Sequence, residues 1–136
     1  MTSFLESSEA RGSSAAVVVG ELIFADASAL DPETFKFGVG ALTIAAETRL
    51  CLERLQQILE GAGCGLEDLI KVNAYLAAES YREEFWAAYE ASLPAGPRPP
   101  RVTQVTSLDG EARVWLDAVA VRDYRGSTAT ADGAER

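Results

Sequence analysis

The sequence predicts an α+β domain in which one mixed β-sheet carries two helices on a single face. Runs of β-branched residues separated by turn signals mark strands near both ends of the chain. Two segments with helical periodicity alternate with a strand in the middle, so the predicted order is β-β-α-β-α-β-β. The length of 136 residues suits one domain, and 48 % apolar with 24 % charged residues is ordinary globular composition.

The predicted domain covers residues 14–122. Residues 1–13 are rich in Ser and Glu and are expected to form a loose lead-in, whereas residues 123–136 have the small, polar composition of a flexible tail. The first residues lack the apolar stretch of a signal peptide, and no segment approaches the length of a membrane span. We therefore expect a cytoplasmic protein that does not contact the membrane.

The first elements are a hairpin, a turn and a long helix. Residues 15–25 (AAVVVGELIFA) predict two strands around Gly20-Glu21, and residues 31–34 (DPET) predict a turn. Over residues 43–61 apolar side chains recur at the spacing of one helix face, and the opposite face is polar and includes Glu47. This segment is predicted to be an amphipathic helix that ends at the glycines from residue 61.

The second half of the sequence predicts a strand, a helix and then two further strands. Residues 69–76 (LIKVNAYL) alternate as a strand, and a second helix is predicted from Ser80, which has capping-box spacing to Glu83, as far as Pro94. The segment 94–100 (PAGPRPP) is stiff and extended because each proline fixes its own φ. Two strands follow, at the end of the predicted sheet: Val102–Ser107 and Arg113–Val121, joined by the turn Leu108-Asp109-Gly110.

Two helices on one face leave the other face of the predicted sheet uncovered. Its strands are rich in valine, and such a surface is not favourably left to water. Oligomerisation through the open face is the expected consequence.

Composition excludes several classes of function. Twelve Lys and Arg stand against 21 Asp and Glu, a net charge of −9, so nucleic acid is not an expected partner. The chain has no histidine, which excludes Ser-His-Asp and Cys-His catalysis and His-based zinc sites. Cys51 and Cys64 are too few for a zinc cluster, and Gly38-Val39-Gly40 lacks the third glycine of a dinucleotide fingerprint. No metal or cofactor is expected.

Arg101 is the main candidate for binding a ligand. The proline-rich segment places it at the start of a strand, where its planar guanidinium can hold a small carboxylate through two hydrogen bonds. Thr103 lies two positions further and is expected on the same side of the strand. Arg98 is the rival cation, and a simple surface ion pair remains an alternative for either arginine.

Taken together, these segments resemble the Rid/YjgF family of reactive-intermediate deaminases, also called the endoribonuclease L-PSP family. The resemblance spans residues 16–122 and rests on a set of motifs in order, namely GELIFA (20–25), LEGAGCGLEDLIKVNAYL (59–76), FWAAYEASLP (85–94), PPRVT (99–103) and VWLDAVAVRD (114–123). It implies a chorismate-mutase-like fold and a homotrimeric barrel with ligand clefts between subunits. In active members an arginine, matched here by Arg101, binds the substrate carboxylate while an imine or enamine is hydrolysed to a 2-keto acid and ammonia.

The resemblance also assigns positions to the remaining site residues. Thr103 falls where many members have a cysteine or threonine, and Ala27 and Ser28 fall in the loop that supplies a backbone amide. Three positions depart from the pattern, with Trp115 in place of the water-orienting glutamate, Ser14 in place of a tyrosine and Trp86 in place of an asparagine. An indole cannot accept the proton that a carboxylate accepts. Asp26, Ser28 and Asp117 are the candidates to replace the missing acid.

Two functions follow from this pattern. The first is a hydrolase of the deaminase type that acts on a small carboxylate-bearing imine, enamine or related reactive intermediate, with Arg101 and Thr103 as catalytic residues and Ser14, Ala27, Ser28, Trp86 and Trp115 around the substrate. The second is a trimer that binds or senses such a molecule without catalysis. Trp86 and Trp115 are interpreted as the floor of an apolar or aromatic pocket, with core packing as the alternative for Trp86. Ribonuclease activity is disfavoured by the acidic charge and the absence of histidine.

Overall fold

The computed structural model describes residues 2–8, 13–34, 36–37 and 43–122. Six strands and two helices follow one another as β1 (Thr2–Ser8), β2 (Ser13–Val19), β3 (Leu22–Ser28), α1 (Ile44–Glu60), β4 (Leu69–Leu76), α2 (Arg82–Ser92), β5 (Arg101–Val105) and β6 (Val114–Val121). Short 3₁₀ turns precede β4 and α2. The predicted tail over residues 123–136 lies outside the described residues.

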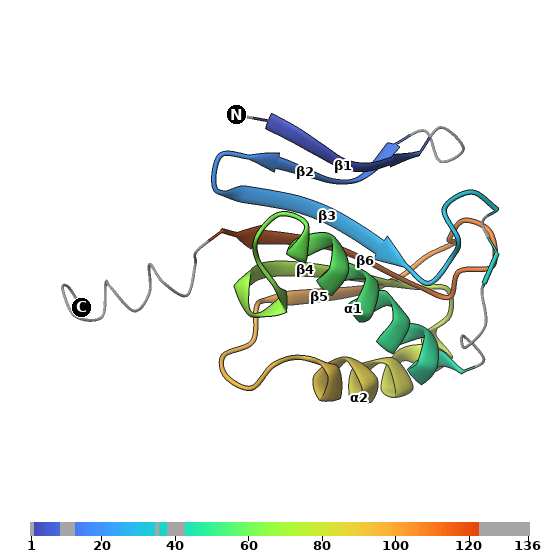
Figure 1. The fold of residues 1–136 in the computed structure, drawn as a ribbon. Coiled ribbons are helices and arrows are strands. Elements are labelled where there is room, and N and C mark those ends of the chain that lie inside the picture. The colour runs from blue at the N-terminus through green and yellow to red at the C-terminus, as the bar shows by residue number, and fades with distance from the viewer. Residues whose placement is uncertain (1, 9–12, 35, 38–42, 123–136) are drawn as a thin grey trace.

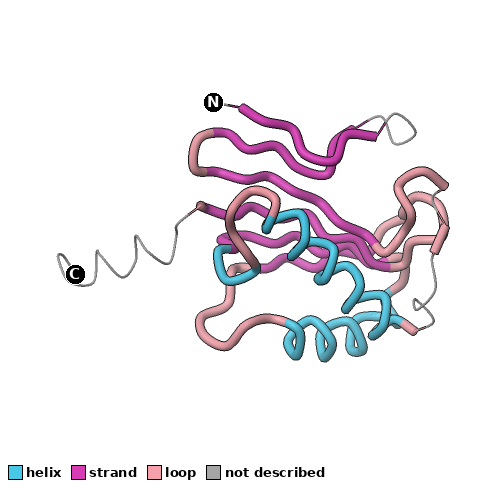
Figure 2. The backbone as a smooth tube through the Cα atoms, in the orientation of Figure 1, coloured by secondary structure: helices cyan, strands magenta, loops and turns pink. Residues whose placement is uncertain are grey.

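The strands form one sheet in the order β1-β2-β3-β6-β4-β5. All neighbours are antiparallel except β4 and β5, which run parallel. Both helices lie on one face of this sheet (Figure 1), and the same arrangement is visible when strands and helices are coloured apart (Figure 2). The predicted α+β class, with both helices on a single face, is therefore confirmed.

Two strand assignments differ from the sequence prediction. Residues 1–13 were expected to be a loose lead-in, but Thr2–Ser8 forms β1 and pairs with β2, with Phe4 opposite Val17. In addition, β5 and β6 are not neighbours, because β4 lies between them. The turn around Gly110, whose φ is 58°, therefore joins two separated strands rather than closing a hairpin.

The hairpin and the first helix form where the sequence predicted them. Gly20 has a φ of 61° between β2 and β3, the left-handed conformation that glycine adopts without strain. Helix α1 starts after Thr43, whose Oγ1 accepts a hydrogen bond from the Ala46 amide at 3.0 Å. Its apolar face packs against the sheet, where Cys51 is fully buried and its burial raises the pKa of the thiol far above its usual range.

Glu47 is buried, although the sequence placed it on the polar face of this helix. Its side chain has no exposed surface. It accepts hydrogen bonds from the Arg113 Nε at 2.7 Å, the Arg113 amide at 2.8 Å and the Val114 amide at 3.0 Å. The carboxylate thus ties α1 to the start of β6.

The second helix begins later than predicted. It starts at Arg82 after the turn Glu79–Tyr81, and no side chain caps it, so the Ser80–Glu83 capping box does not form. Phe85 and Tyr89 are buried in the core, as their spacing predicted.

The face of the sheet opposite the helices carries exposed apolar side chains. Strands β1, β2 and β3 contribute four of them: Phe4 (66 % exposed), Val19 (45 %), Phe24 (43 %) and Leu22 (37 %). This surface, called the open face below, was predicted from the one-sided placement of the helices. None of the helices in the described part of the chain is both long and apolar enough to cross a membrane.

Candidate functional site

Arg101 is the first residue of β5, which is an edge strand of the sheet. It lies in register with Val72 of β4, whose side chain is fully buried under the helices. Since neighbouring residues in register point to the same face, the Arg101 side chain points toward α2. There it keeps 21 % of its surface exposed.

Three aromatic rings of α2 surround the Arg101 guanidinium. Its Cζ lies 4.8 Å from the ring centroid of Tyr89, 5.7 Å from that of Trp86 and 6.0 Å from that of Phe85. These distances suit cation–π attraction and hold the group in one place without using its N–H donors. Its Nη1 also forms an ion pair with the Glu90 carboxylate at 3.7 Å, a distance beyond hydrogen-bond range. The surface ion pair that the sequence left open as an alternative is therefore present at Arg101.

Arg98, the rival cation, is engaged differently. Its Nη1 donates to the Pro94 carbonyl and its Nη2 donates to the Glu90 carbonyl at 3.2 Å. Its Nε also lies 4.0 Å from the Glu90 carboxylate. These contacts secure the proline-rich segment to the end of α2, so Arg98 has a structural role and Arg101 is the better candidate for a ligand.

Thr103 and Trp86 join Arg101 on this side of the sheet. Thr103 lies two residues along β5 and faces α2, as expected, and its Oγ1 is 3.5 Å from Nε1 of Trp86. Trp86 is 39 % exposed and does not belong to the core. Arg101, Thr103 and Trp86, which we call the arginine edge, therefore form one cluster.

Ser28 and Trp115 lie on the open face instead. They are opposite each other in the β3–β6 ladder, and Trp115 also faces Tyr75 of β4. Trp115 alternates with Leu116, which is fully buried under the helices. Ser28 is 8 % exposed, and its Oγ accepts a hydrogen bond from the Leu30 amide at 3.2 Å. Ala27 points to the opposite, helix side and is 1 % exposed, so only its backbone can meet a ligand.

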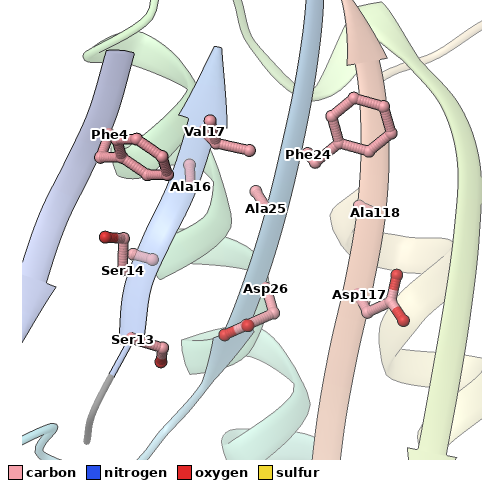
Figure 3. A pocket seen from close by; sticks show the side chains of 11 residues that line it. Phe4, Ser13, Ser14, Ala16, Val17, Phe24, Ala25, Asp26, Asp117 and Ala118 are labelled. Carbon is pink, nitrogen blue, oxygen red and sulfur yellow. The ribbon is translucent and has the colours of Figure 1, made fainter. Parts of the chain in front are cut away.

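Ser14 lines a hollow of about 510 Å³ on the sheet (Figure 3). Aligned pairing of β2 with β3 runs from Val19 only as far as Ala16, and the hollow lies where this register stops. Its wall combines apolar and polar side chains from four strands: Phe4, Ser13, Ser14, Val17, Phe24, Asp26 and Asp117, with alanines between them.

Two aspartates line this hollow. Asp26 and Asp117 are opposite each other in the β3–β6 ladder. In Figure 3 the Asp26 carboxylate leans toward β2, whereas that of Asp117 leans the other way, toward β4. The Tyr75 hydroxyl donates to Asp117 Oδ2 at 3.1 Å, and desolvation together with this carboxylate raises the pKa of Tyr75. Sequence analysis named both aspartates but missed Tyr75, because the β4–β6 register that pairs them is non-local.

The predicted site residues thus fall into two groups on opposite faces of the sheet. The arginine edge faces α2, whereas Ser14, Ser28 and Trp115 belong to the open face. Within one chain the sheet separates Arg101 from both aspartates and from Trp115. No group of three or more His, Cys, Asp or Glu side chains that could hold a metal ion occurs among the residues that the structure describes.

Comparisons with known proteins decide the family. The family model of endoribonuclease L-PSP matches residues 6–122. The chain belongs to this family, also called Rid/YjgF. The resemblance read from the sequence motifs is therefore confirmed.

Individual relatives agree with this assignment. A RutC family protein of Pyrococcus abyssi is 31 % identical over 120 residues, which cover 81 % of this chain and 86 % of that protein. The 2-iminobutanoate/2-iminopropanoate deaminase of Salmonella typhimurium is 27 % identical over 100 residues, covering 68 % of this chain and 73 % of the enzyme. The crystal structure of RidA from an Antarctic Psychrobacter superposes with a TM-score of 0.72 at 26 % identity, covering 85 % of this chain and 92 % of that one.

Proposed function

We propose that this Rid/YjgF protein hydrolyses a small carboxylate-bearing imine or enamine to a 2-keto acid and ammonia. The observation that carries the proposal is the environment of the Arg101 guanidinium. Three rings fix its guanidinium, part of the side chain reaches solvent, and its one carboxylate neighbour among the described residues is too distant for a hydrogen bond. A planar cation with donors to spare suits bidentate binding of a carboxylate.

The reaction needs a water molecule and two proton transfers. An enamine first tautomerises to the imine. Water then adds to the imine carbon and its proton passes to the nitrogen; the resulting carbinolamine expels ammonia as the C–N bond breaks, the C=O bond forms and the hydroxyl proton passes to the nitrogen. Arg101 binds the carboxylate next to the reacting carbon and so fixes the substrate relative to the water. Thr103 supplies a hydroxyl beside it.

The acid–base role is assigned to the aspartates of the open face. Trp115 occupies the position where the family's glutamate is expected, and an indole accepts no proton. Asp117 lies two residues further on the same face of β6, and its hydrogen bond from Tyr75 holds one carboxylate oxygen in place. We assign the water to Asp117, with Asp26 as the second candidate.

A site of this kind requires a second copy of the chain. The sheet separates Arg101 from Asp117 within one chain, so one copy provides the arginine edge and the next provides the open face. The exposed apolar side chains of the open face support such an assembly. We propose a homotrimer in the cytoplasm, with three clefts between copies, and no nucleic acid, membrane or cofactor.

The expected match of Trp115 to the family's water-orienting glutamate favours a second candidate function. With Trp115 at the glutamate position, the same clefts can bind a carboxylate without turning it over, as a sensor or carrier does. RNA cleavage is not proposed, because a chain with net charge −9 and no histidine suits neither RNA affinity nor acid–base cleavage of RNA.

Keto-acid release from imines separates these functions. The imines are generated in situ from a panel of amino acids by an amino-acid oxidase, and release is compared with the spontaneous rate. We expect acceleration by the wild type and its loss in Arg101→Gln, while Arg98→Gln retains it. No acceleration across the panel, together with Arg101-dependent binding of the keto acids, would establish the binding protein instead.

A further inference from the structure

Trp86 has the features of a ligand-binding side chain rather than a core residue. It follows Phe85 and precedes Tyr89 on α2, and both of those rings are at most 2 % exposed, whereas Trp86 is 39 % exposed. Trp side chains are enriched at binding interfaces, where part of the ring packs against the protein and part is solvated.

The indole is held in one orientation. Its Nε1 is directed at the Thr103 hydroxyl at 3.5 Å. The guanidinium groups of Arg101 and Arg82 each lie 5.7 Å from its centroid. Arg82 is itself fixed by Glu79, which accepts hydrogen bonds from its Nε at 2.6 Å and its Nη2 at 2.8 Å. A ring fixed in this way contributes contact area at little entropic cost.

The spacing along β5 matches one kind of ligand. Arg101, Thr103 and Val105 share one side of the strand, and Val105 is 41 % exposed. Two residues along a strand span about 6.6 Å. In an imine that carries a phenyl ring one methylene beyond the imine carbon, the carboxylate and the far edge of the ring are about the same distance apart. A ligand whose carboxylate is bound at Arg101 and whose chain runs toward Thr103 places such a ring beside the indole of Trp86, because the indole centroid is 5.7 Å from the Arg101 Cζ and its Nε1 is 3.5 Å from the Thr103 hydroxyl.

We infer that Trp86 selects carboxylates with an aromatic side chain, so that the substrate class is the imines of aromatic 2-amino acids rather than those of short aliphatic ones. The inference rests on the proposed function in one respect, because it takes Arg101 as the carboxylate-binding group. Trp86 acts as a specificity residue and takes no part in the proton transfers.

Calorimetric binding of two unreactive carboxylates, 3-phenylpropanoate and butanoate, tests the inference on the assembled full-length protein. We expect the wild type to bind 3-phenylpropanoate more tightly, and the ratio of the two affinities to fall about 2- to 10-fold in Trp86→Leu. Trp86→Phe should keep most of the ratio. Glu83→Ala, an exposed change one turn earlier in α2, should leave it unchanged.

Each other outcome has a definite meaning. Equal loss of both ligands in Trp86→Leu, or an unchanged ratio, overturns the selectivity. If both ligands bind equally well and Arg101→Gln abolishes both, the carboxylate site stands and only the aromatic preference fails. If neither ligand binds the wild type, the proposed function and this inference fail together.

Discussion

Replacing Glu47 provides a quantitative test of the buried contact between α1 and β6. The carboxylate is fully buried and accepts three hydrogen bonds, two of them from backbone amides and one from the Arg113 guanidinium. Breaking a buried, hydrogen-bonded ion pair from one side costs about 3–5 kcal/mol. The Arg113 side chain is 27 % exposed and can recover some hydration, so we expect the lower end, about 3 kcal/mol, for Glu47→Ala.

Glu47→Gln keeps the shape of the side chain but replaces one acceptor oxygen with an NH₂ group, which can accept a hydrogen bond neither from the two backbone amides that share Oε2 nor from the Arg113 Nε that binds Oε1. We expect it to lose about 2 kcal/mol, since at least one buried donor is left unpaired. Urea unfolding at one fixed protein concentration measures both changes, because the stability of an oligomer depends on concentration. Glu53→Gln, an exposed change on the same helix, is the control. A Glu47→Gln midpoint equal to that of the control would refute the reasoning.

Three further predictions concern the acid–base group, the assembly and pH. Asp117→Asn should lower keto-acid release about 100-fold or more, which is the usual effect of losing a general acid or base. The control Asp109→Asn, in the exposed turn, should leave release unchanged. Equal rates for the two variants would exclude Asp117 as the acid–base group. Light scattering should give three times the chain mass of 14.5 kDa for the wild type. Phe24→Glu places a charge on the open face and should give the mass of a single chain. A monomeric wild type would contradict the trimer. Burial raises the pKa of Tyr89 to about 12, so its neutral form stabilises the fold below pH 10 and that contribution is lost as pH rises from 10 to 12. Tyr89→Phe should therefore reduce the fall in stability between pH 10 and pH 12 in urea unfolding, and an unaltered fall would show that another group causes it.

The parts of the fold that the sequence predicted are those set by local pattern. The periodicity of residues 43–61 and the alternation of residues 69–76 each specify an element and its buried face. Because both helices were predicted on one face of the sheet, the other face was expected to be open. The insertion of β4 between β5 and β6 is a non-local pairing, which no turn signal encodes.

The sequence predicted which residues belong to the site better than it predicted where those residues lie relative to one another. Arg101 and Thr103 were expected on the same side of their strand, and they are. The sequence did not reveal that Trp115 and the two aspartates lie across the sheet from them, since this depends on which strand is paired at each register. Glu47 was assigned to the polar face because its type suggests exposure, while its actual partners are backbone amides 66 and 67 positions away.

A mixture of two inactive variants tests the composite site most directly. Arg101→Gln and Asp117→Asn are co-expressed in equal amounts, and keto-acid release is measured on the imine that the wild type turns over best. Random assortment into trimers pairs an intact Arg101 with an intact Asp117 from the neighbouring copy in about one quarter of the clefts. The account predicts recovery to about that fraction of wild-type activity. A mixture no more active than the two variants measured separately would contradict a site shared between copies.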